Sequence, residues 1–250
     1  RGLLPEELVD MGILKRESWK FKLIKKVERV LVEKAECVIT VSNKFTDYIT
    51  ANFTPKRVLN INNPTDFRVY SRGRKNRNRV TFIYSGSMLV WHEPQLTVQY
   101  FYELYKVFGN KVFFKFCTND VGEAQKIFEN SCLPSESYEI LNVPFSEMPL
   151  QYSQSDIAFC IIKNSLSKSV CFPVKFSEYI ASNLFILTNN DIGDLSEIIG
   201  RYKCGTVFYD LENITENVSK VSEIVSSMLD GTYVDYNRDE MPFLDWRREG

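Results

Sequence analysis

The sequence predicts an α/β fold in which a parallel sheet is covered by helices on both faces. Three observations support this fold class. Short apolar runs rich in Val, Ile and Phe recur after residue 79, a helical pattern follows each run, and the runs have no polar side. Strands without a polar side are typical of sheets that are buried on both faces.

The regular part of the chain, after residue 79, is expected to hold alternating strands and helices. The strands are expected at residues 80–84, 112–117, 138–143, 157–162, 185–188 and 206–209. The helices are expected near residues 94–108, 121–130, 146–154, 173–182, 193–200 and 213–229. Because ligands of such sheets bind at the carboxyl ends of the strands, a site is expected in the loops that follow them.

The first 79 residues predict a shorter set of elements. A long helix at 17–35, a strand at 37–41, a helix at 43–52 and a strand at 57–61 precede turn residues at 62–66. The basic run that follows, up to residue 79, has almost no apolar content. We therefore expect it to be a solvated linker.

The composition describes a globular protein and argues against several function classes. The chain is 44% apolar and 25% charged, and its net charge of −1 argues against general nucleic-acid binding. It contains no run of about 18 apolar residues that would span a membrane. Its six cysteines are far apart, which indicates free thiols in a reducing, cytoplasmic compartment. His92 is the only histidine, so no metal site is expected.

Two loops at the expected ligand edge have the composition of anion sites. The first, Tyr84-Ser85-Gly86-Ser87-Met88, lets the backbone approach a ligand and present N–H groups to a phosphate, although a plain tight turn is the alternative. His92 follows it, and a protonated imidazole there would face the phosphate. The second loop, 163–171, carries Lys163, an amide and several hydroxyls ahead of a helix N-terminus.

The stretch FPVKFSEYIASNLFIL places Lys175 and Glu178 in an otherwise apolar helix. The two residues lie about one turn apart, and a solvated surface ion pair is one interpretation. The other interpretation follows from the anion site ahead of the helix. Glu178 would then lie just beyond a phosphate, where a carboxylate suits a sugar hydroxyl, as in dinucleotide-binding folds.

Several stretches resemble, in the same order, one known family. The helix at 17–35 runs into AECVITVSNKFTDYI, and NNPTDF, FIYSGSM, YSQSDIAFCII and PVKFSEYIASNLFILTNNDIGDLSEII follow. Over roughly residues 20–200 these resemble the C-terminal two-thirds of glycosyltransferase family 4, the group 1 enzymes with a GT-B fold. The resemblance implies a Rossmann-like donor domain and a retaining, metal-independent transfer of a sugar from a nucleotide-diphosphate-sugar donor.

The resemblance also implies roles for individual residues. Glu178 matches the glutamate that binds the nucleotide ribose, and the backbone near Val174 matches the helix start that meets the diphosphate. Gly86 and Ser87 match the loop that faces the phosphates. Val143 with Pro144 matches the strand end that touches the base.

Two positions depart from the family pattern. The family usually has a second glutamate eight positions before Glu178, where this chain has Val170. It also usually has an arginine and a lysine where Ser87 and His92 fall. Diphosphate binding would then depend on His92, Lys175 or Lys163, and Lys175 joins Glu178 as a candidate catalytic residue.

The resemblance implies a domain division and a function for the chain. Residues 1–62 would be the end of a partial N-terminal Rossmann-like acceptor domain, 63–79 the basic linker, 80–232 the nucleotide-sugar-binding domain and 233–250 a tail. The chain, beginning at Arg1, is expected to be a fragment of a hexosyltransferase-like enzyme of polysaccharide biosynthesis that acts on a glycan or lipid-linked acceptor. On its own this fragment is expected to bind donor weakly or not at all and to be inactive. A non-catalytic nucleotide-sugar-binding or scaffolding module is the alternative. A sugar-nucleotide epimerase would need cleft acid/base groups that the sequence does not identify.

The basic helix within residues 15–35 suggests a further partner. Its cations alternate with Trp19, Phe21, Leu23 and Val27, a composition that suits an anionic membrane surface. Contact with the inner surface of a membrane is therefore one expectation for this helix. A helix with a solvated basic face is the other.

Overall fold

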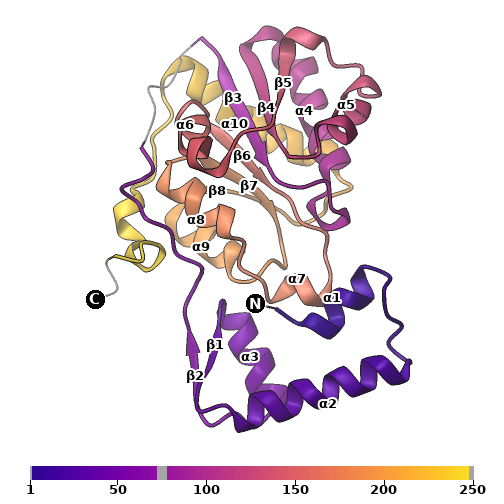
Figure 1. The fold of residues 1–250 in the computed structure, drawn as a ribbon. Helices are drawn as coiled ribbons and strands as arrows, with labels where there is room; N and C mark the ends of the chain where they lie inside the picture. The colour runs from indigo at the N-terminus through magenta and orange to yellow at the C-terminus, as the bar shows by residue number, and fades with distance from the viewer. Residues whose placement is uncertain (1, 72–77, 248–250) are drawn as a thin grey trace.

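A computed structural model describes residues 2–71 and 78–247 and shows a large lobe above a small one (Figure 1). The strands are β1 (Val38–Thr40), β2 (Val58–Asn60), β3 (Val80–Ser85), β4 (Val112–Cys117), β5 (Tyr138–Leu141), β6 (Ile157–Cys160), β7 (Phe185–Asn189) and β8 (Gly205–Phe208). The helices are α1 (Leu4–Asp10), α2 (Trp19–Lys34), α3 (Asn43–Asn52), α4 (Pro94–Phe108), α5 (Val121–Glu129), α6 (Met148–Ser153), α7 (Leu166–Ser169), α8 (Val174–Ala181), α9 (Leu195–Tyr202) and α10 (Ile214–Asp230).

The large lobe is built on a parallel sheet with the strand order β5-β4-β3-β6-β7-β8. The chain builds outward from β3 to β5 on one side, then returns to add β6 beside β3 and continues to β8. The order therefore reverses between β3 and β6, and this reversal is the place where doubly wound sheets bind their ligands. The prediction of a parallel sheet covered by helices is confirmed.

Side chains of successive strand residues pack on opposite faces of this sheet, because the strand period is two. Phe82 belongs to the core that packs against α4, α5 and α10. Its neighbour Ile83 belongs to the core that packs against α6, α8 and α9. Both residues are fully buried, so the centre of the sheet is covered on both faces. Within the described residues, no helix is long and apolar enough to cross a membrane.

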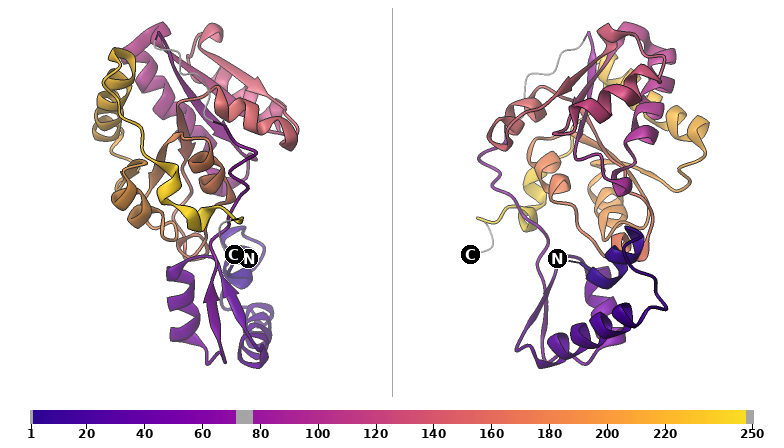
Figure 2. Two further views of the ribbon diagram at one scale, coloured as in Figure 1. Left: turned by 90° about the vertical axis from the view of Figure 1, so that its left-hand side faces the viewer. Right: turned by 45° about the vertical axis from the view of Figure 1, so that its right-hand side comes forward.

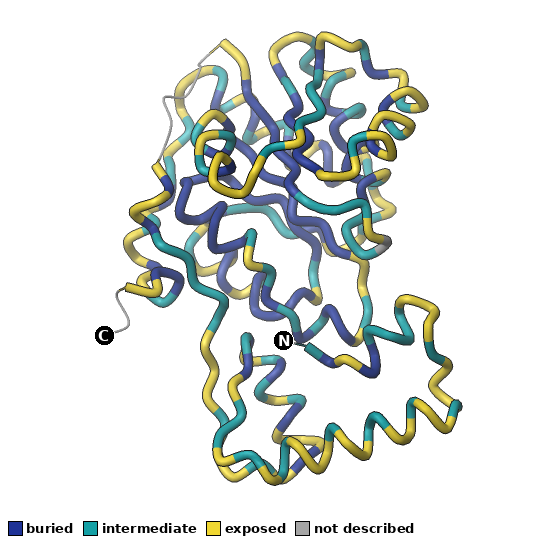
Figure 3. Tube along the Cα trace, in the orientation of Figure 1, coloured by how far each residue is buried: buried dark blue, intermediate teal, exposed yellow. Residues whose placement is uncertain are grey.

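The small lobe consists of α2, β1, α3 and β2, and it is much more exposed than the large one (Figure 3). β1 and β2 form a two-stranded parallel sheet. Its small core includes Phe45 and Ile49 of α3, and Val170 of the large lobe joins this core. Between the lobes, α1 packs against α7. Neither α1 nor α7 is predicted by the sequence pattern.

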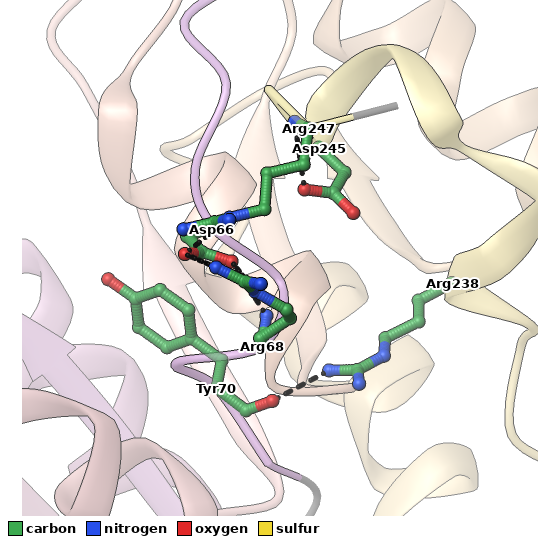
Figure 4. Close-up of polar contacts among 6 residues, drawn as sticks. All are labelled: Asp66, Arg68, Tyr70, Arg238, Asp245 and Arg247. Atoms are coloured by element: carbon green, nitrogen blue, oxygen red, sulfur yellow. Dashed lines mark hydrogen bonds and ion pairs between the residues drawn. The ribbon is translucent and has the colours of Figure 1, made fainter. Parts of the chain in front are cut away.

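The connector, of which residues 61–71 and 78–79 are described, joins the lobes, and its first part runs beside the C-terminal tail (Figure 2). The N–H of Thr65 donates to the Leu244 carbonyl at 2.9 Å, and Arg247 forms an ion pair with Asp66 at 2.8 Å (Figure 4). Phe67 and Tyr70 of the connector are buried in the large-lobe core. The expectation of a solvated linker is therefore wrong for this part, because its aromatic residues and the tail supply apolar contacts.

Some residues of the predicted linker lie outside the described part of the chain, as does Arg1. They are residues 72–77, which include Arg72, Arg74, Lys75 and Arg77.

Candidate functional site

An open cleft of about 860 Å³ lies at the carboxyl ends of the strands beside the reversal point. This volume falls in the range of small-ligand sites. Its walls come from the loops after β3, β4 and β5 and from the helices α6 and α8. The lining residues are Ser85, Gly86, Ser87, His92, Cys117, Thr118, Asn119, Asn142, Val143, Pro144, Phe145, Met148, Tyr152, Val174, Lys175 and Glu178.

The turn after β3 brings backbone close to the cleft lysine. The N–H of Gly86 donates to the Cys117 carbonyl at 3.0 Å, which ties the turn to the end of β4. A Cβ at position 86 would lie 2.6 Å from Nζ of Lys175 and 2.7 Å from the hydroxyl of Tyr84. Glycine is therefore required here for a close approach rather than for an unusual backbone angle.

Helix α8 points its N-terminus at the cleft. Pro173 precedes the first helical residue, Val174, and no side chain caps the helix start. Val174 is half-exposed and lines the cleft, so the free N–H groups of the first turn lie at its wall. Such groups, together with the helix dipole, favour an anion.

Lys175 is a cation in a poorly solvated place. Its Nζ lies 5.7 Å from the centroid of the Tyr84 ring. Burial lowers the pKa of Lys175 from 10.5 to about 8, and nearby Cys160 and Glu178 only partly oppose this. Among the described residues that line the cleft, Lys175 is the only lysine or arginine.

Glu178 lies deeper, with 4% of its surface exposed, and Tyr152 donates a hydrogen bond to its Oε2 at 3.0 Å. Burial raises the pKa of Glu178, while the hydrogen bond from Tyr152, the charge of Lys175 and the Tyr70 hydroxyl act in the opposite direction. Lys175 and Glu178 do not form an ion pair within 4.0 Å. The interpretation of this pair as a solvated surface ion pair is thus wrong, because both side chains turn inward.

The hydroxyl network around Glu178 continues into the sheet. Ser85 Oγ lies 2.9 Å from the hydroxyl of Tyr152 and 3.0 Å from that of Tyr179. Sequence reasoning missed Tyr152 and Tyr70 as members of the site. The one available signal was the position of Tyr152 in YSQSDIAFCII, just before the strand that borders the reversal point.

His92 lines the cleft but is uncharged at neutral pH. Burial, followed by the positive charges of Lys175 and Lys168, lowers the pKa of His92 to about 3. The sequence expectation of a protonated imidazole beside a phosphate therefore does not hold for the ligand-free protein. A neutral imidazole can still donate one hydrogen bond.

The other predicted residues divide into those that reach the cleft and one that does not. Gly86, Ser87, Val143, Pro144 and Val174 all line it. Lys163 is exposed and lies outside the described cleft lining.

The rest of the loop 163–171 packs against α1 instead of facing the cleft. Lys168 forms an ion pair with Glu7 at 3.0 Å, and Ser167 donates to Asp10 at 2.5 Å. Of the anion site expected in this region, only the N-terminus of the following helix, α8, therefore lies at the cleft.

Val170 explains why the second carboxylate is absent from the cleft. Its side chain is buried in the apolar core of the small lobe, with Phe45, Ile49 and Phe53. Its carbonyl accepts a hydrogen bond from Ser42 at 2.8 Å. The position serves contact between the lobes, and a charge there would be desolvated.

Comparison with known proteins identifies the fold of the chain but no sequence family. No family model and no curated protein matches the sequence. Solved structures match it in fold, glycosyltransferases among them, and the shared architecture is that of GT-B glycosyltransferase domains.

Three of these structures illustrate the likeness. WaaG, a glycosyltransferase involved in lipopolysaccharide biosynthesis, is 13% identical with a TM-score of 0.66, over 92% of this chain and 67% of WaaG. Anabaena HepE, in complex with UDP and glucose, is 13% identical with a TM-score of 0.61, over 90% of this chain and 65% of HepE. The pneumococcal O-GlcNAc transferase GtfA, in complex with UDP and GlcNAc, is 13% identical with a TM-score of 0.60, over 89% of this chain and 46% of GtfA.

Proposed function

We propose that the cleft binds a nucleotide-diphosphate sugar and that the protein transfers the sugar to a glycan or lipid-linked acceptor. One observation carries the proposal. At the reversal point of a doubly wound sheet, a buried carboxylate, a single lysine, a glycine turn and a free helix start face the same cleft. This set matches the parts of a donor in size and charge. The fold likeness to transferases that bind UDP and a sugar supports the same class of donor.

Each part of the donor has a partner in this proposal. The diphosphate lies at the first turn of α8 and beside Lys175, and the ribose hydroxyls donate to Glu178. The base lies against Val143 and Pro144. As the bond from the sugar to the diphosphate breaks, negative charge grows on the leaving phosphate, and the protonated Lys175 stabilises it there.

Retention of configuration and independence from metal belong to the same proposal. The resemblance to family 4 implies both, and the lysine and helix start supply positive charge at the leaving group. The identity of the acceptor is also part of the proposal. This chain spans between 46% and 67% of the length of WaaG, GtfA and HepE.

Titration calorimetry with UDP, GDP and ADP in the presence of EDTA tests donor binding. The wild-type chain is expected to bind at least one of them, and Glu178→Ala is expected to abolish that binding. Glu223→Ala, on the exposed side of α10, is the matched control and should bind as the wild type does. Binding that is unchanged in Glu178→Ala, or absent from the wild type, contradicts the proposal.

A non-catalytic donor-binding or scaffolding module is the second candidate. The observation that favours it is Val170, whose burial in the small-lobe core leaves Glu178 without a second carboxylate. Radiolabelled donor separates the two functions. Sugar transfer or donor hydrolysis by the protein supports the enzyme, whereas binding without turnover supports the module.

Contact with an anionic membrane is a further part of the proposal, and α2 supports it. None of the residues of α2 is buried, and its outer side exposes Trp19, Leu23, Val27, Val30 and Leu31. Residues 15–34 contain eight basic and three acidic residues, in a chain whose net charge is −1. An apolar stripe bordered by cations suits the surface of an anionic bilayer.

Flotation with vesicles tests the membrane contact. The wild type is expected to float with vesicles of phosphatidylcholine and phosphatidylglycerol, and much less with phosphatidylcholine alone. The double variant Trp19→Ser and Leu23→Ser should lose this binding. Failure of the wild type to float with anionic vesicles would show that another protein surface, or solvent, covers α2.

A further inference from the structure

Glu178 is held from two directions outside its own helix. Tyr152 of α6 donates to its Oε2 at 3.0 Å, and the buried Tyr70 of the connector is close enough to lower the pKa of the same carboxyl. The rings of Tyr70 and Tyr152 stack, with their centroids 6.1 Å apart and their planes at 28°. Only Tyr70 of this group belongs to the segment that joins the two lobes.

The tail in turn fixes Tyr70. Arg238 Nη1 donates to the Tyr70 carbonyl at 3.0 Å (Figure 4). The Arg238 guanidinium also lies 5.6 Å from the centroid of the Phe67 ring. Further along, Arg247 and Asp66 form the ion pair described above. We call these contacts between residues 65–70 and the tail the clamp.

We propose that Tyr70 is a positioning residue that couples the clamp to Glu178 and so sets how well the cleft holds its donor. The inference rests on the proposed function, in which Glu178 accepts the ribose hydroxyls. The tail holds the backbone of Tyr70, and the Tyr70 ring packs on Tyr152, which donates to Glu178. Loosening the clamp therefore shifts the tyrosines around this carboxylate, and donor affinity changes with it.

A purely structural role for Tyr70, as a filler of the core, is the competing explanation. Tyr70→Phe separates the two, because it keeps the ring and its stacking on Tyr152 but removes the hydroxyl. Tyr105→Phe is the matched control. The Tyr105 hydroxyl donates to Asn110, just beyond the end of α4, at 3.2 Å, and neither residue lines the cleft.

The first readout is the titration of Glu178 itself. Its carboxylate is faced by Tyr152 from α6, by Tyr70 from the connector and by Lys175 from its own helix. The Tyr70 hydroxyl is one of the groups that lower the pKa of Glu178, so its loss is expected to raise that pKa. NMR of the side-chain carboxyl carbons of labelled glutamates measures this without any ligand, and Glu178→Gln assigns the resonance.

The second readout is the pH profile of UDP binding by calorimetry. Because a protonated Glu178 no longer accepts both ribose hydroxyls, the loss of affinity on acidification should begin at a higher pH in Tyr70→Phe than in the wild type. The affinity would fall by up to about tenfold in that range and little at alkaline pH. Arg238→Ala, which loosens the clamp and leaves the hydroxyl in place, should change the profile in the same direction but less.

The outcomes separate this inference from the proposed function. An unchanged Glu178 titration in Tyr70→Phe overturns the positioning role, even if UDP binds. A shifted titration in a protein that binds no nucleotide keeps Tyr70 as the partner of Glu178 but overturns the coupling to a donor and the proposed function together. A lower melting temperature with both readouts unchanged shows that Tyr70 only fills the core.

Discussion

Replacement of Lys175 by methionine is expected to stabilise the protein while it removes the diphosphate partner. Burial lowers the pKa of this lysine from 10.5 to about 8. A difference of this size corresponds to about 3 kcal/mol of unfavourable free energy for the charged form in the folded protein. Methionine has a similar length and no charge, so Lys175→Met should raise the free energy of unfolding by up to about 3 kcal/mol at about pH 7.

The sign of this effect depends on pH in a defined way. Below a pH of about 8, Lys175 is charged in both the folded and the unfolded chain, and its penalty is fully present. Between that value and 10.5 the folded chain loses the proton first, so wild-type stability rises relative to the variant. The advantage of methionine should therefore be largest near neutrality and vanish in strong alkali.

Urea denaturation at a series of pH values measures the difference. Lys220→Met is the control, because Lys220 is exposed and pairs only with Glu216 on α10. Its effect should stay within about 0.5 kcal/mol. A Lys175→Met protein that is less stable than the wild type at neutral pH would refute the account of Lys175 as a desolvated cation held for ligand binding.

Three other predictions follow from the same geometry. UDP affinity, measured by calorimetry, should fall about tenfold from about pH 7 to about pH 9, because Lys175 loses its proton with a pKa of about 8. An affinity that does not change with pH would exclude Lys175 as the diphosphate partner. Gly86→Ala should weaken UDP binding at least about tenfold, because a Cβ at position 86 would lie 2.6 Å from Lys175 Nζ and would push the ammonium group away. The loss in the free energy of unfolding should stay below about 2 kcal/mol. Unchanged affinity would contradict this prediction. Val170→Glu should lower the free energy of unfolding by at least about 3 kcal/mol in urea denaturation, because it buries a carboxylate in an apolar core. A variant as stable as the wild type would show that position 170 does not lie in that core.

The arrangement of the large lobe could be predicted because its cause is local. Runs such as VTFIYS are apolar on both sides, and this composition alone favours a strand buried on both faces. The position of Glu178 followed from its place behind the strand at the reversal point. Gly86 and Val174 followed from the same rule, since both lie at the carboxyl edge of the sheet.

The parts that could not be predicted depend on contacts between distant segments. Val170 meets Ser42, which lies 128 residues earlier, and no local pattern shows that pairing. Tyr70 lies in a segment whose composition is that of a linker, and only the packing of the tail makes it part of the site. The neutral state of His92 depends likewise on burial and on two lysines from another part of the chain.

A crystal structure of the protein with UDP tests the central claim most directly. The account predicts the diphosphate at the first turn of α8 beside Lys175, the ribose hydroxyls on Glu178 and the base against Val143 and Pro144. UDP bound elsewhere on the protein, or bound in the cleft with its ribose away from Glu178, would contradict it.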